Sequence, residues 1–121
     1  MEQSEINRRN KLLGEFMGYE FVDEYSFRTK NGEKTFDREN LTYGSNWNSL
    51  MYVVDKIEDI DFDLNLGYSV TIVGHVCLIK RKHLTDGSQR ELLIVVPAMS
   101  KIEAVFIACS DFVEQYNKTK I

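Results

Sequence analysis

The segment that most constrains the fold is residues 100–116, close to the carboxyl end of the chain. It opens with Ser100-Lys101-Ile102-Glu103, a capping box that marks the start of a helix. Apolar residues then recur at helical spacing: Ile102, Val105, Phe106, Cys109, Phe112, Val113 and Tyr116, widened by Ala104, Ile107 and Ala108. A helix that is apolar around so much of its circumference needs packing partners on two sides. We therefore expect it to lie between a sheet and a neighbouring helix.

Two further helices are predicted earlier in the chain. Ser4 is a candidate cap for the first, which has one mainly apolar face and ends near Gly18, a residue common at helix ends. The second follows a cap at Ser45 or Asn46 and has a clearer apolar face: Trp47, Leu50, Met51, Val54 and Ile57. The sequence thus predicts three helices, with the last one the most strongly marked.

Turn and alternation signals predict strands between the helices. An Asn31-Gly32 turn between two β-prone runs predicts a small exposed hairpin. Residues 59–66 alternate as a half-buried strand does, or form an extended connection. Residues 68–73 and 76–79 predict two strands joined by a tight turn, and Glu91 to Val96, closed by Pro97, predicts a third.

The order helix, hairpin, helix, strands, helix indicates an α+β fold, with an antiparallel sheet packed with helices. We expect one domain over residues 1–121, because 43% hydrophobic residues suffice for one core of this size. The two cysteines, Cys77 and Cys109, lie in apolar segments and are expected to be reduced core residues.

Charge and apolar run lengths exclude several classes of protein. A net charge of −4 argues against general nucleic-acid binding, which needs a field of positive charge. The longest apolar runs fall far short of the roughly 20 residues that a bilayer span needs. The first residues are acidic and polar, where a signal peptide is basic and then apolar. We expect a cytoplasmic protein with no membrane partner.

Three blocks of the sequence carry a resemblance to a known group of proteins. They are residues 11–18 (KLLGEFMG), residues 43–58 (YGSNWNSLMYVVDKIE) and residues 100–105 (SKIEAV) leading to 112–117 (FVEQYN). With this order of elements, the chain resembles small phage and prophage proteins of unknown function, of the phage ABA-sandwich type. The resemblance implies a compact helix, sheet, helix sandwich and a bacterial host cytoplasm. It implies no catalytic residue and no cofactor.

Metal-binding patterns in the sequence are incomplete. His75 and Cys77 would share one face of a strand, but a structural zinc site needs a second ligand pair, so a core cysteine is the favoured interpretation. The aspartates at 59–63 imitate the start of a calcium loop, yet Leu64 and Val70 stand where that loop needs Gly and Glu. We predict no metal site.

One basic segment stands out in this acidic chain. Its residues are suited to an anionic ligand: Lys80, Arg81, Lys82 and Arg90 as charge-assisted contacts to phosphate, with Tyr43 or Trp47 to stack on a base. The alternative is a solvated loop at a strand end, which is the commoner role of surface charge.

Three hypotheses of function follow. The leading one is a non-enzymatic phage-type accessory protein that counters host defence by sequestering a small anionic ligand such as a signalling nucleotide, with a homo-oligomer if the pocket lies between chains. The second is a protein-protein inhibitor or assembly factor that docks on a host protein through an apolar helix face or a sheet edge. The third is an enzyme of unrecognised type, although no catalytic motif is found.

Overall fold

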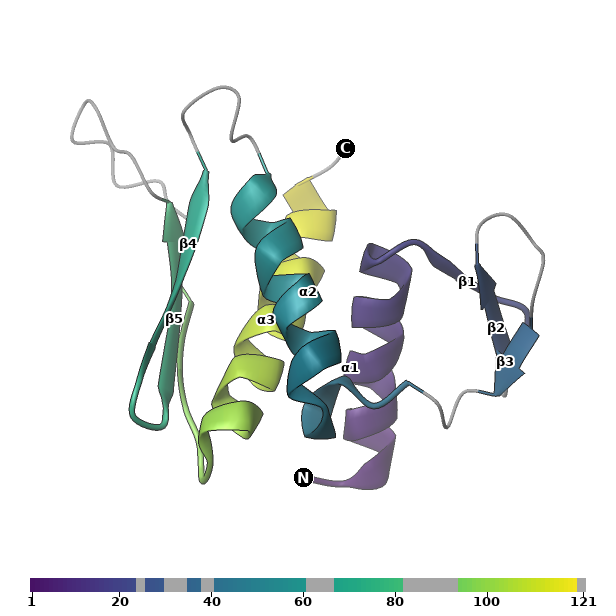
Figure 1. The fold of residues 1–121 in the computed structure, drawn as a ribbon, viewed down its shortest axis with the longest axis horizontal. Helices are drawn as coiled ribbons and strands as arrows, with labels where there is room; N and C mark the ends of the chain where they lie inside the picture. The colour runs from purple at the N-terminus through teal and green to yellow at the C-terminus, as the bar shows by residue number, and fades with distance from the viewer. Residues whose placement is uncertain (24–25, 30–34, 38–40, 61–66, 82–93, 120–121) are drawn as a thin grey trace.

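The computed structural model describes residues 1–23, 26–29, 35–37, 41–60, 67–81 and 94–119. Helices and strands follow the order α1 (Gln3–Phe16), β1 (Tyr19–Phe21), β2 (Ser26–Thr29), β3 (Thr35–Asp37), η2 (Tyr43–Ser45, a 3-10 turn), α2 (Trp47–Asp59), β4 (Tyr68–Val73), β5 (Val76–Arg81), β6 (Ile94–Pro97) and α3 (Lys101–Thr119). They form layers, with the sheet β4-β5-β6 at one side, α2 and α3 beside it, then α1, and the sheet β1-β2-β3 at the far side (Figure 1). The predicted α+β fold is confirmed.

Helix α3 joins these layers. The Ser100 hydroxyl accepts a hydrogen bond from the Glu103 N–H at 3.3 Å, as the capping box predicts. Along the helix, Val105, Cys109 and Phe112 are fully buried. Because α3 contacts β5 and β6 as well as α1 and α2, the predicted packing on two sides is confirmed.

Arginine side chains fasten α1 to α3. The Arg9 side chain is only 14% exposed, and its Nη1 donates to Ser110 Oγ and to Asp111 Oδ1, both at 2.7 Å. One turn away from this contact, Arg8 forms an ion pair with Glu114. The interface between the two helices is therefore partly ionic rather than wholly apolar.

The sheet β4-β5-β6 is antiparallel, with β5 in the centre. The two-residue turn Gly74-His75 joins β4 to β5, as predicted, with Val73 opposite Val76. Gly74 has φ of +59°, which glycine adopts more readily than other residues. Alternate side chains of the three strands point to the helices and are buried: Tyr68, Cys77, Ile79, Ile94 and Val96.

The predicted hairpin pairs as expected, but it belongs to a second sheet. Phe27 of β2 lies opposite Phe36 of β3, and β1 adds a third strand on the other side of β2. Tyr19 and Phe21 of β1 pack on Phe27, with ring centroids 5.1 Å and 6.0 Å apart. The sequence pattern missed β1, which follows α1 directly and makes this second sheet three-stranded.

Two details of the helix boundaries test the predicted caps. Helix α1 begins after Glu2, which makes no side-chain cap hydrogen bond, so the cap at Ser4 is wrong. In α2, the cap is Asn46, whose Oδ1 accepts from the Ser49 N–H at 3.3 Å. The alternation at residues 59–66 lies mostly outside the described residues, and Asp59 is the last residue of α2.

Candidate functional site

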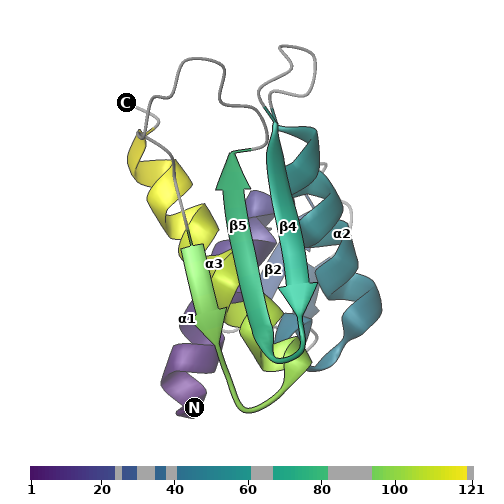
Figure 2. The same ribbon diagram turned by 90° about the vertical axis from the view of Figure 1, so that its left-hand side faces the viewer.

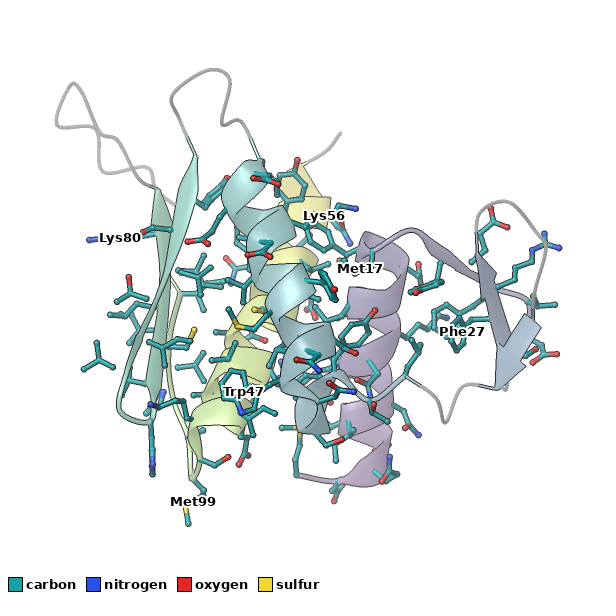
Figure 3. The ribbon with its side chains drawn as sticks, in the orientation of Figure 1. Met17, Phe27, Trp47, Lys56, Lys80 and Met99 are labelled. Atoms are coloured by element: carbon teal, nitrogen blue, oxygen red, sulfur yellow. The ribbon has the colours of Figure 1, made fainter. Side chains whose placement is uncertain are left out.

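The predicted anion site is described only in part. Lys80 is exposed near the end of β5 and points away from the helices (Figure 3). Arg81 closes the strand, but its side chain, together with Lys82 and Arg90, lies outside the described residues. Among the side chains that the structure describes, none forms an ion pair with Lys80.

The two candidate stacking residues lie elsewhere. Tyr43 is 5% exposed, and burial, together with the nearby Tyr19, raises the pKa of its hydroxyl to about 12. A ring so buried has little free face for a base. Trp47 is 39% exposed at the first residue of α2, toward the opposite end of the molecule from Lys80 (Figure 3). The structure therefore does not bring Lys80 together with Trp47 or Tyr43.

The most distinctive surface is the outer face of the sheet β4-β5-β6. The strand register places six mainly apolar side chains there in two rows, which we call the outer-face patch: Thr71, Leu78 and Val95 in one row, and Val73, Val76 and Pro97 in the other. Val73 is 62% exposed and Val95 53% exposed. Figure 2 looks onto this face, and no described helix or strand covers it.

Pro97 obstructs the addition of a further strand at the free edge of β6. The Ala98 N–H donates to His75 O, so residues 94 and 96 direct their backbone groups to β5, while Val95 and Pro97 direct theirs to the outside. Proline has no N–H to offer there, which blocks pairing with an additional strand.

The other edge, along β4, is occupied by a side chain of α2. The outward N–H of Val70 donates to Glu58 Oε2 at 3.3 Å. Both edges of this sheet therefore carry an obstacle to strand addition, whereas no described helix or strand covers its outer face.

A cavity of about 260 Å³ lies at the start of α3. Its walls are mainly apolar and come from three regions: Met1, Ile6, Gly44, Ser100, Ile102, Glu103 and Phe106. A Cβ at Gly44 would stand 3.1 Å from the Phe106 ring, so glycine permits this close contact. Of the described side chains in the walls, only Glu103 is charged.

The cysteines are placed as core residues, as predicted. Both are fully buried, and burial raises the pKa of the Cys77 thiol to about 11 and that of Cys109 well above its usual range. Such thiols are poor nucleophiles at neutral pH. His75 lies in the exposed β4-β5 turn, not on a strand beside Cys77. In the described ranges, no three His, Cys, Asp or Glu side chains are grouped to hold a metal ion.

Comparisons with known proteins leave the family open. No protein-family model matches the chain, and no match was found among curated proteins or solved structures. The resemblance to phage proteins therefore stays a prediction. Considering only the part of the chain that the structure describes, no helix combines the length and apolarity needed to cross a bilayer.

The sequence did carry a signal for the outer-face patch. Residues 76–79 and 94–97 are continuous apolar runs, whereas a strand with one solvated face alternates apolar and polar residues. Runs of this kind indicate strands that are apolar on both faces. Such runs predict where the strands lie, but they do not show what covers the second face.

Proposed function

We propose that the chain is a non-enzymatic protein-binding domain that docks on another protein surface through the outer-face patch. The observation that carries this proposal is the apolar sheet face, which no described helix or strand covers and on which Val73 and Val95 are more than half exposed. Exposure of contiguous apolar surface to water is unfavourable in free energy, and such a surface commonly marks an interaction site. An accessory role in a phage, as inhibitor or assembly factor, belongs to the same proposal.

The structure favours the sheet face over the sheet edges and over the apolar face of α3. Among the described residues, the apolar sides of α3 are occupied by the sheet and by the other two helices. The edges of β4 and β6 are blocked by Glu58 and Pro97. Recognition through side chains of the outer face is the mode that remains for this sheet.

Site-specific photo-crosslinking in cells tests the proposal. A photoreactive phenylalanine analogue at position 78 is expected to give a covalent adduct with a protein, because Leu78 lies in the middle strand of the patch. The matched control carries the same analogue at Val22, which is 52% exposed at the far side of the molecule. Failure to form an adduct at 78, or the same adduct at both positions, would contradict the proposal.

A second hypothesis, capture of a small anion, is favoured by the exposed Lys80. We propose Lys80, Arg81, Lys82 and Arg90 as its contacts, with charge-assisted hydrogen bonds to phosphate. The protein purified from cells is denatured, and the released small molecules are identified by mass spectrometry. A stoichiometric phosphorylated compound that is lost in the Arg81→Glu/Arg90→Glu variant supports this function. Recovery of the same compound from the variant argues against it.

A further inference from the structure

We infer that the outer-face patch docks on the same patch of a second copy of the chain, forming a face-to-face dimer of the two sheets. This inference rests on the proposed function and names its partner. The charge distribution is the first argument, because Lys80 is the one charged side chain among the described residues of this face. A face with so little charge is poorly equipped to select an unlike, charged partner, but it is complementary to itself.

The two rows of the patch are compatible with a two-fold axis that runs across the strands, midway between the rows. The row of Leu78 then lies on the row of Val76 in the second copy, so that apolar side chains meet apolar side chains. This is the aligned packing in which two sheets form a sandwich.

The same axis explains how Lys80 is accommodated. Lys80 lies two residues beyond Leu78, so it falls opposite the Gly74-His75 turn of the second copy, at the open end of the interface. There its ammonium group stays in contact with water. An axis parallel to the strands would instead set Lys80 against Lys80, which like-charge repulsion disfavours.

The size of the patch sets the strength of the dimer. Three strands about 4.8 Å apart, with two rows of outward side chains, present a few hundred Å² in each copy. A standard interface buries about 800 Å² per partner, so this one belongs with weak and reversible interfaces. The blocked edges of β4 and β6 fit this arrangement, because they leave the face as the route by which two sheets associate.

Sedimentation velocity over protein concentrations from about 5 to about 500 µM, the range of weak interfaces, tests the inference. The wild-type chain is expected to shift from monomer to dimer. The Leu78→Glu variant is expected to stay monomeric, and the Val22→Glu control to dimerise as the wild type does. Far-UV circular dichroism and thermal melting establish that each variant is folded. A wild-type chain that stays monomeric throughout, or a folded Leu78→Glu variant that still dimerises, overturns the inference.

Cross-linking tests the orientation independently. A short bismaleimide is added to Leu78→Cys chains, to Val76→Cys chains, and to a mixture of the two. The proposed axis predicts that the mixture cross-links several-fold more than either variant alone, whereas an axis parallel to the strands predicts most product from Leu78→Cys alone and overturns the orientation.

The two proposals fail in distinguishable ways. A monomeric purified chain together with a photo-crosslinked adduct to a different protein rejects the dimer and keeps the docking function. Absence of any adduct in cells rejects the docking function itself.

Discussion

Asn10 is a polar side chain at a buried position of α1, with 7% of its surface exposed. Its Oδ1 accepts a hydrogen bond from the Tyr43 N–H at 3.2 Å, which ties η2 to α1. Replacement by alanine leaves that buried N–H without its acceptor. We expect Asn10→Ala to lower the free energy of unfolding by about 1–3 kcal/mol, measured by urea denaturation.

Asn7 provides the matched control, since it is the same residue type on the same helix. Its Oδ1 accepts an exposed hydrogen bond from Gln3 Nε2 at 2.9 Å. Asn7→Ala should change the free energy of unfolding by no more than about 0.5 kcal/mol. Equal losses for the two variants would mean that the Asn10–Tyr43 hydrogen bond contributes nothing specific.

The same contact shows what the sequence could not reveal about single residues. Tyr43 reads as an exposed aromatic because it stands beside turn residues, Gly44 and Ser45, and outside any apolar period. Its burial comes from segments far away in the chain, including Asn10 at 33 residues' distance. Local sequence patterns do not reveal such contacts, and for this reason the sequence predicts a stacking role for Tyr43, which is a core residue.

At the scale of elements, the ionic contact between α1 and α3 predicts a pH dependence. Arg8 hydrogen-bonds both Glu5 and Glu114 and thereby holds the pKa of both carboxyls below their usual range. The unfolded chain then takes up protons at a higher pH than the folded chain. The stabilisation is complete above the ordinary carboxyl pKa and is lost as pH falls through the lowered folded values.

Urea denaturation between about pH 6 and about pH 3, which spans the ordinary carboxyl pKa values, measures this effect. We expect the free energy of unfolding to fall with acid, and to fall less steeply in Arg8→Met. The control is Arg28→Met, which removes the exposed ion pair with Glu20 on the β1-β2-β3 sheet and should keep the wild-type slope. An unchanged slope in Arg8→Met would contradict the prediction.

Most individual elements could be predicted from the sequence, because their signals are local. The capping box of α3, the apolar period of α2 and the Gly74-His75 turn each lie within a few residues of the element that they define. Strand β1 was missed because it has three residues and depends on pairing with β2 for its existence. The division of the strands between two sheets likewise depends on contacts between residues far apart in the sequence.

At the scale of the whole molecule, the blocked edge of β6 predicts resistance to aggregation. Pro97→Val restores an N–H at the free edge while keeping an apolar side chain on the outer face. We expect this variant to aggregate faster than the wild type in a concentration-dependent way, measured by light scattering. Val95→Ile, which leaves the backbone donors unchanged, should behave as the wild type does. If the Pro97→Val variant aggregates at the same rate as the wild type, Pro97 does not prevent strand addition at this edge.

The sequence could predict the type of candidate site but not its position in the fold. A protein-binding surface was among the hypotheses, but its place on the sheet face depends on which side of β5 the helices cover. Leu78 and Ile79 are equally apolar in the sequence, and only the packing of α3 makes one buried and leaves the other in the patch.

Helix α3 contacts the sheet, α1 and α2, yet it comes last among the elements of the chain. A ribosome that makes this protein therefore translates both sheets and two helices before the element that connects them. Until then their apolar surfaces share no common partner and are open to chaperones. We expect a nascent chain halted before residue 101 to be sensitive to protease, and the folded state to arise only once the last helix has emerged.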